Sequence, residues 1–422
     1  MKYFLIFLLM MRMAPAVATD IDYQDLPPAA QVEAVLDNNI NVQAAAKGVQ
    51  VEQASQRKWD SGNYEFNLRA GSAQRNIAAT GQNLREWDVA LERPLRWVNK
   101  VLIDGDIGAE GVSRAGYALG DARHEAARQL LHLWFNWQRE QAQAVQWQQQ
   151  VDILRQQAGM TEKRMLAGDA PRMELNLAQA AAAQASVALQ QASMRAQLAA
   201  SELKRPFPEL ALPAQVVMLT PLPLEHDLAW WQQQVMEDNH ELGMAQAESR
   251  IQQLMAKRSS ADRLPDPTVG VRYSSEKEGE EKIAGIYVSV PISFGLRGAS
   301  SEISRYHADI AYSRELATRR RLEGDVYAAY TQAAGSYLVW QQAQQAAGSV
   351  RENAELVARA CTLGESSLSE TLNARRQALE SSLAATMAQL DANETRYRLL
   401  LDAHLLWAFE DEMVKHNGDS IK

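Results

Sequence analysis

Hydrophobic and polar residues alternate along four short stretches of the chain, arranged in two widely separated pairs. The first pair covers residues 63–72 and 86–93, and the second pair covers residues 267–275 and 283–292. An alternation of period two predicts β-strands, because successive side chains of a strand point to opposite faces of the sheet. Each pair is therefore expected to form a hairpin, with a polar loop over residues 72–85 in the first.

The charged residues of these stretches share one face of each predicted strand, and apolar residues share the other. Two structures explain this pattern: a sheet with a soluble outer face, or a barrel with lipid outside and water inside. In a barrel, the charged residues would face a water-filled lumen. They are Glu65, Arg69, Asp88, Glu92 and Arg272.

Three tryptophans, Trp59, Trp87 and Trp97, flank the first pair of strands. Transmembrane barrels carry a girdle of aromatic residues at each membrane interface. These tryptophans are therefore candidates for such a girdle, with ordinary packing as the alternative.

Long helical runs follow each pair of strands, and a shorter helix, predicted over residues 28–59, precedes the first. Residues 97–165 and 297–363 contain no proline. At ~1.5 Å per residue, each run would extend roughly 100 Å. Helices so much longer than those of ordinary globular domains predict coiled-coil or α-barrel packing.

Each long run ends at a short polar turn centred on a glycine, Gly168 or Gly364. A second helix then returns, over residues 171–203 in one case and 366–409 in the other. An acid in the first turn of each returning helix suits the helix dipole. These features predict the tip of a helical hairpin, made twice.

The two tips align with each other at several positions. Superposing Gly364 on Gly168 gives an offset of 196 (364 − 168), which also places Glu370 opposite Glu174. The order helix, strand, strand, long helix, turn, helix therefore occurs twice. A repeat of this length indicates internal duplication of a whole fold unit.

The duplication divides the chain into a first repeat, residues 19–205, and a second repeat, residues 228–409. Five prolines keep residues 206–227 from being helical throughout, so this segment is a linker. Residues 410–422 form a polar tail. The helical hairpins span residues about 97–205, with the tip near 168, and about 297–409, with the tip near 364.

Composition narrows the possible functions. The chain has 422 residues, a net charge of −9 and no basic stripe, which argues against a nucleic-acid partner. The single cysteine, Cys361, excludes an internal disulfide framework. No catalytic motif or metal-ligand spacing occurs, and the seven histidines are predicted not to cluster. The chain is therefore not expected to be an enzyme or to hold a cofactor or metal.

The first 18 residues have the pattern of a secretory signal peptide. Lys2 precedes an apolar run, and Ala16-Val17-Ala18 forms a small-residue cleavage site. The apolar run is too short to span a bilayer, and no other run reaches ~20 residues. A mature chain that enters a membrane would do so as strands.

Four strands cannot close a barrel, and an open sheet edge cannot face lipid because its backbone groups would lack partners. Two copies would supply about eight strands, a barrel whose interior is filled by its own side chains. Three copies would supply about twelve strands, a barrel wide enough to leave a pore. The residues alone leave this choice open.

Taken together, these features resemble the outer membrane factor family, the TolC-like channels of Gram-negative bacteria. The resemblance rests on the duplication, on the tips LAGDAPRMELNLAQ and TLGESSLSETLNARR, and on ERPLRW and VPISFG after the strands. It implies an α+β membrane protein: a trimeric 12-stranded β-barrel in the outer membrane lipid, continued by a long periplasmic α-helical barrel. It also implies a periplasmic adaptor (membrane fusion protein) and an inner-membrane pump of the RND or ABC type.

The resemblance also suggests functional residues near the tips. Glu370 and its counterpart Glu174 would each form a ring of three carboxylates that narrows the periplasmic entrance and raises the pKa of its members. Asn373 stands one turn later, where family members often carry a second acid, and Cys361 stands where some carry a tyrosine. Simple helix capping by the two glutamates is the alternative. The adaptor would dock on the tips Leu166, Ala167, Gly168, Leu363, Gly364 and Glu365.

The leading functional hypothesis is a passive exit duct of a tripartite efflux system, carrying heavy-metal cations or small toxic compounds. The short chain resembles the metal-efflux branch of the family. The outer-membrane duct of a type I protein secretion system is the first alternative, and a periplasmic coiled-coil scaffold is the second.

Overall fold

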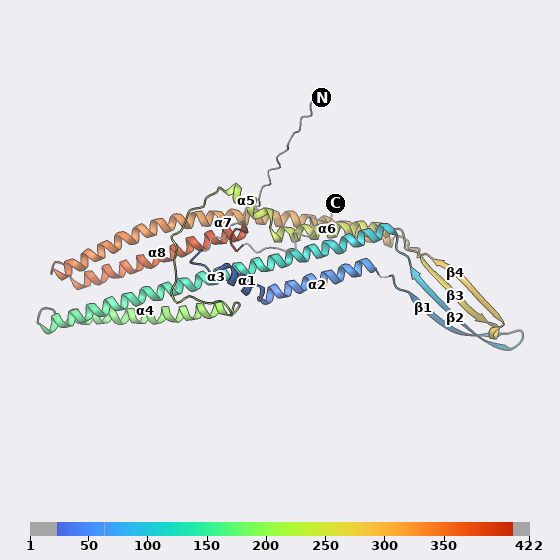
Figure 1. The fold of residues 1–422 in the computed structure, drawn as a ribbon, viewed down its shortest axis with the longest axis horizontal. Coiled ribbons are helices and arrows are strands. Elements are labelled where there is room, and N and C mark those ends of the chain that lie inside the picture. Colours follow the sequence, from blue (N-terminus) through green and yellow to red (C-terminus); the bar gives the residue numbers. More distant parts are fainter. Residues whose placement is uncertain (1–22, 63, 408–422) are drawn as a thin grey trace, which may run out of the picture.

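The computed structural model describes residues 23–62 and 64–407, so the predicted signal peptide and polar tail lie outside the described residues. This part of the chain is an elongated body with a β-sheet at one end and the tips of two helical hairpins at the other (Figure 1). The elements are α1 (Ala29–Asp37), α2 (Ile40–Ser61), β1 (Asn67–Ile77), β2 (Gln82–Pro94), α3 (Val98–Leu166), α4 (Arg172–Lys204), α5 (Leu228–Glu237), α6 (His240–Ala261), β3 (Thr268–Glu276), the short 3₁₀ helix η1 (Lys277–Gly279), β4 (Glu281–Ser289), α7 (Leu296–Thr362) and α8 (Leu368–Asp402).

The duplicated order of elements predicted from the sequence is confirmed. Each repeat runs through two shorter helices, two strands, one very long helix and a returning helix. Both long helices are unbroken, 69 residues in α3 and 67 in α7. No helix among the described residues is both long and apolar enough to cross a membrane.

The single helix predicted over residues 28–59 is wrong, because the structure has two helices there. α1 ends before Asn38, and the side chain of Asn39 then accepts a hydrogen bond from the backbone N–H of Asn41 at the start of α2. Asn239 begins α6 in the same way, 200 residues later. Asparagine is a strong helix N-cap, and this capping preference outweighed the helical periodicity of the flanking residues.

The four strands form one antiparallel sheet in the order β1-β2-β3-β4. The central pair, β2 and β3, joins the two repeats. The first hairpin is longer than the alternation predicted, since β1 continues to Ile77 and β2 begins at Gln82, within the predicted polar loop. Polar side chains do not end a strand, and the chain reverses only where Gly81 takes a positive φ of 69°.

The main hydrophobic core lies midway along the molecule, at a level that we call the waist. It unites α1 and the middle of α3 with the ends of α4 and α8. Phe207 and Leu210, from the proline-rich linker, are buried in it. The linker contains no regular helix or strand, but the carbonyl of Leu219 accepts hydrogen bonds from the side chains of Gln389 and Asn393.

Candidate functional site

The polar face of the sheet brings together four of the five charged residues predicted to face a lumen. Cross-strand register places Arg69, Asp88, Glu92 and Arg272 on this one face. Arg69 pairs with Glu92 at 3.2 Å, and Arg272 lies 3.8 Å from Asp88. Glu65 is different, because β1 begins only at Asn67, so its placement on a strand was wrong.

The opposite face of the sheet carries an exposed apolar band. Register aligns four of its residues in one row across the sheet: Leu68, Leu91, Val271 and Ile286. All four are exposed to solvent in the single chain. Trp87 lies on this face and packs on Tyr273, with the ring centroids 5.7 Å apart. A continuous apolar face of this kind is typical of a surface that contacts lipid.

Trp59 and Trp97 lie elsewhere, at the junction between the sheet and the helices. The indole Nε1 of Trp97 donates to the carbonyl of Pro265, and the carbonyl of Trp59 accepts from Arg96. Of the three tryptophans, only Trp87 lies on a strand.

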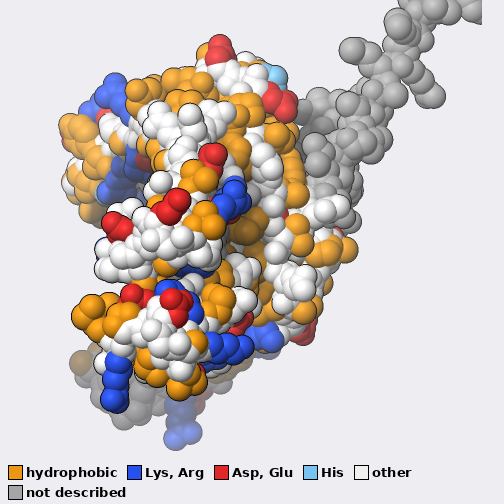
Figure 2. Space-filling model, turned by 90° about the vertical axis from the view of Figure 1, so that its left-hand side faces the viewer, with side chains coloured by type: hydrophobic (Ala, Val, Ile, Leu, Met, Phe, Trp, Pro, Cys, Tyr) orange, Lys and Arg blue, Asp and Glu red, His pale blue; other side chains and the backbone are white. Residues whose placement is uncertain are grey.

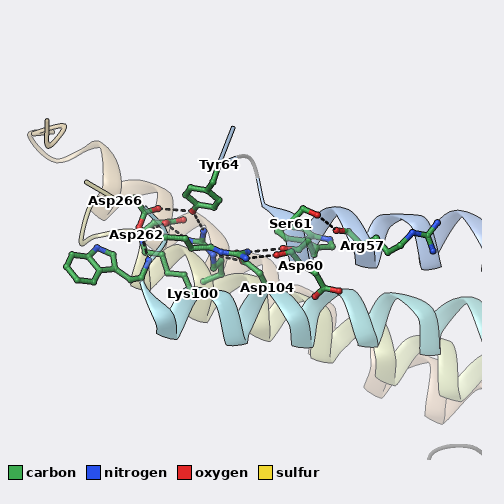
Figure 3. Close-up of polar contacts among 12 residues, drawn as sticks. Arg57, Asp60, Ser61, Tyr64, Lys100, Asp104, Asp262 and Asp266 are labelled. Atoms are coloured by element: carbon green, nitrogen blue, oxygen red, sulfur yellow. Dashed lines mark hydrogen bonds and ion pairs between the residues drawn. The ribbon is translucent and has the colours of Figure 1, made fainter. Parts of the chain in front are cut away.

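A buried cluster of charged residues fills this junction (Figure 3). Lys100, on the first turn of α3, is 1% exposed, and its Nζ lies 2.9 Å from both Asp262 and Asp266. Asp104, one turn later, accepts from Arg96 and Arg258. Acids and bases from both repeats therefore neutralise one another where the strands leave the helices, as buried charges require.

Tyr64 completes the junction on the side of β1. Its hydroxyl donates to Oδ2 of Asp266 at 2.9 Å. Burial, together with this hydrogen bond, raises the pKa of Tyr64 to about 12, so the phenol remains a donor at any physiological pH. No local pattern in the sequence signals this cluster, because charges along a long helix are normally solvated and the partners lie more than 150 residues apart in sequence, as Lys100 and Asp262 do.

The two hairpin tips have the same backbone turn. Gly168 and Gly364 both have a φ of 79°. The residue after each glycine donates its backbone N–H to the carbonyl five positions earlier, from Asp169 to Arg164 and from Glu365 to Ala360. This is the Schellman arrangement that ends many helices, and it favours glycine. In the end-on view, apolar side chains lie among charges of both signs at this end (Figure 2).

Glu370, the predicted gate residue, caps the first turn of α8. Its carboxylate accepts from the backbone N–H of Ser367 at 2.9 Å and from the hydroxyl of Ser366 at 2.7 Å. The Ser367 hydroxyl accepts in return from the Glu370 backbone, which completes a capping box. Hydrogen bonds from the Ser367 backbone, then from the two hydroxyls, lower the pKa of Glu370 in the single chain. Within one chain, Glu370 therefore acts as a helix cap, which was the alternative to a role in a carboxylate ring.

The other predicted tip residues differ from Glu370 in their contacts. Glu174 lies in the first turn of α4, but its N-cap, Pro171, makes no side-chain cap. Asn373 is exposed on α8. Leu166 and Leu363, the apolar tip residues, are also exposed, as a docking surface requires. No described contact joins the two tips' glutamates.

The prediction that the histidines do not cluster is wrong for three of them. The rings of His124, His240 and His404 meet at the waist, with centroids 5.1–6.4 Å apart. Burial, with the nearby Arg128, lowers the pKa of His124 to about 3. These residues come from α3, α6 and the turn after α8, so only the tertiary fold unites them. Within residues 23–62 and 64–407, no three or more His, Cys, Asp or Glu side chains are grouped so that they could hold a metal ion.

Comparison with solved structures identifies the class of fold. The outer membrane channel CmeC of Campylobacter jejuni superposes with a TM-score of 0.75 at 14% identity, covering 92% of this chain and 88% of that one. VceC, an outer membrane protein of Vibrio cholerae, gives 0.72 at 13% identity, covering 92% and 100%. The MtrE outer membrane channel of Neisseria gonorrhoeae gives 0.63 at 14% identity, covering 90% and 89%.

The chain therefore has the fold of the TolC-like outer membrane factor channels, as the sequence resemblance predicted. No protein-family model and no curated protein matches the sequence itself.

Proposed function

We propose that the protein is the outer-membrane channel of a tripartite efflux system in a Gram-negative bacterium. The observation that carries this proposal is the sheet, which has a continuous apolar band on one face and charged residues on the other and stands at the end of long helical hairpins. Lipid would contact the apolar face, and water would fill the space on the charged side. The hairpins would extend the duct through the periplasm.

The proposal requires more than one copy of the chain. Within the described chain, β1 and β4 are the edges of the sheet, and each pairs on one side only. Unpaired backbone groups cannot face lipid, so the edges must join those of neighbouring copies. Three copies give 12 strands (3 × 4), enough for an open lumen. The trimer implied by the resemblance to TolC-like channels agrees with this number.

Membrane fractionation tests the assignment of the two faces. Leu68→Arg would place a charge on the lipid face and destabilise the assembled barrel by roughly 2–4 kcal/mol near the midplane. Arg69→Leu, its neighbour on the polar face, is the matched control and should assemble normally. Cross-linking and fractionation should recover wild type and control as outer-membrane trimers. Equal assembly of the two variants, or recovery of the wild type as a soluble monomer, contradicts the proposal.

The hairpin tips are the proposed docking surface for a periplasmic adaptor. Leu166-Ala167-Gly168 and Leu363-Gly364-Glu365 form the end of the molecule farthest from the sheet (Figure 1). Gly364→Trp should abolish export by blocking the adaptor while leaving the trimer intact. Gly364→Asn is the control, because asparagine tolerates the positive φ without the bulk. Export that survives in Gly364→Trp would place docking elsewhere.

The substrate class follows from the charge at the entrance. Three Glu370 carboxylates near one axis would attract cations and repel bulky anions. We therefore favour heavy-metal cations or small cationic toxic compounds, delivered by an RND or ABC pump. A deletion strain should become sensitive to such compounds and regain resistance with the intact gene. A deletion strain that keeps its resistance but no longer secretes a particular protein would instead support type I secretion.

A further inference from the structure

Large polar side chains lie along the charged face of the sheet instead of projecting away from it. Tyr287 on β4 shows this best, because its hydroxyl donates to Oε2 of Glu92 on β2, across the intervening strand β3. From β1, Nη2 of Arg69 donates to the same Oε2 at 3.2 Å and to the Tyr287 hydroxyl at 3.3 Å. A belt of three side chains thus crosses all four strands.

Gly270 provides the space for this belt. It lies on β3 directly opposite both Glu92 on β2 and Tyr287 on β4, so the Tyr287 ring crosses over it. A Cβ at this position would be 2.5 Å from Cζ of Tyr287 and 2.7 Å from its hydroxyl oxygen. Gly270 is buried, and Tyr287 is the one half-buried residue of β4, whose other residues are exposed. The ring therefore rests on the glycine backbone.

The same relation recurs two rows away on the same face. Gly71 lies opposite Asp88, and a Cβ on Gly71 would be 2.6 Å from Oδ1 of that aspartate. Ala90 is opposite both Arg69 and Arg272 and is only 2% exposed, although it belongs to a single open sheet. Small residues thus repeatedly lie beneath long polar ones.

We propose that Gly270 is a positioning residue that holds the Tyr287 ring against the barrel wall and thereby sets the width of the lumen. This inference rests on the proposed channel function. In a trimer, three rings would lie along the wall, tethered by Glu92 and Arg69, and leave the water path open for bulky solutes. A side chain at position 270 would lift the ring off the wall and into the lumen, because the strand beneath it cannot give way.

The test is polymer exclusion in planar bilayers containing the full-length trimer. Polyethylene glycols of graded size are added on the side of the barrel, where they probe the lumen of the barrel rather than the distant tips. Gly270→Ala should reduce the largest polymer that enters. Gly285→Ala is the matched control, since Gly285 shares this face and a Cβ there would meet nothing within 4 Å. The double variant Gly270→Ala/Tyr287→Ala should restore the wild-type size limit for polymer entry, because it has no ring to displace into the lumen.

A second variant keeps the backbone unchanged. Tyr287→Phe retains the ring but removes the hydroxyl that binds Glu92 and Arg69, so it should also lower the size limit. If Tyr287→Phe and every assembled Gly270→Ala channel keep the wild-type limit, the positioning role is refuted. A wild-type protein that forms no channel would instead refute the proposed function, so the two failures are distinguishable.

Discussion

The two hairpin tips share one backbone turn but differ in the side chains that secure it. At the first tip, Nε of Arg164 pairs with Asp169 at 3.0 Å, across the end of α3. At the second, Ser367 and Glu370 form a capping box at the start of α8. The duplication has kept what the turn requires, a glycine with positive φ, and has changed the polar contacts around it. The tips are therefore not equivalent surfaces.

The two long helices differ more strongly than the tips. α3 has nineteen buried residues, whereas α7, of nearly the same length, has six. α3 packs against α2, α4, α6 and α8, while α7 packs against α5, α6 and α8. Large apolar residues remain exposed along α7, among them Ile303, Ile310, Leu338 and Val339. α3 thus lies within the core of one chain, whereas α7 presents a face that we expect a neighbouring copy to cover.

The largest expected difference between the repeats is at the junction. Lys100→Met leaves Asp262 and Asp266 without their buried partner, which should lower the free energy of unfolding by about 3–5 kcal/mol. Arg297 occupies a similar position at the start of α7 and donates to the carbonyl of Asp262. Arg297→Met should cost less, about 1.5–3 kcal/mol, since its acceptor is uncharged. Thermal unfolding in detergent, followed by circular dichroism, measures both, and equal losses contradict the prediction.

The next difference concerns the helix cores. Leu131 in α3 is 1% exposed, and its equivalent in α7 at the offset of 196 is Tyr327, which is 57% exposed. Leu131→Ala should destabilise each chain by about 2–5 kcal/mol. Tyr327→Ala should leave the unfolding of the single chain unchanged but lower the temperature at which the trimer dissociates. Trimer gels after graded heating provide the measurement. An unchanged dissociation temperature would mean that α7 does not contact another copy there.

The capping box should make the second tip the more sensitive to loss of a hydroxyl. Ser367→Ala removes the cap and should destabilise the first turns of α8 by about 0.5–2 kcal/mol. Pro171→Ala at the equivalent position of the first tip removes no side-chain cap and serves as the control. Hydrogen exchange of residues 366–372 should accelerate in Ser367→Ala only. Equal protection in wild type and variant would show that the cap contributes nothing.

Acid should affect the second tip through the same residue. The pKa of Glu370 is lowered in the folded chain below its ordinary value of 4.5. Its contribution to stability is therefore complete above about the ordinary pKa and is lost as the pH falls through the lowered pKa. Hydrogen exchange at the start of α8 should accelerate on acidification below pH 4.5, and less so in Glu370→Gln. If the tip already loosens well above that pH, mutual repulsion in a trimeric ring must dominate over the cap.

The smallest expected effect concerns conduction. Glu370→Ala should raise single-channel conductance in planar bilayers and reduce block by multivalent cations, and Glu174→Ala should do less. Glu370→Gln separates charge from capping, because glutamine can still accept the capping hydrogen bonds. It should reproduce the loss of cation block while leaving the tip ordered. If multivalent cations block the Glu370→Gln channel as strongly as the wild-type channel, Glu370 acts only as a cap.

Local patterns in the sequence predicted the elements and their duplicated order well. The proline-free runs ending at glycine turns placed both ends of α3 and α7 within one or two residues, and strand alternation assigned Arg69 and Leu68 to opposite faces. The break at Asn39 and the extra length of β1 escaped prediction, because capping and cross-strand pairing decide them. Features made by distant residues, such as the Lys100 cluster and the three histidines, carry no local signal.

Asp25 at the waist has a consequence for the order of assembly. Its carboxylate accepts from the hydroxyl of Tyr397 at 2.8 Å, and its carbonyl accepts from Trp134 and Gln138. The partners Asp25 and Tyr397 are separated by 372 residues. Contacts so distant in sequence form late, since closing the intervening chain costs entropy before any gain. As the chain folds, each helical hairpin can form outward from its own turn. The contacts at the waist require α8, so we expect them to form last.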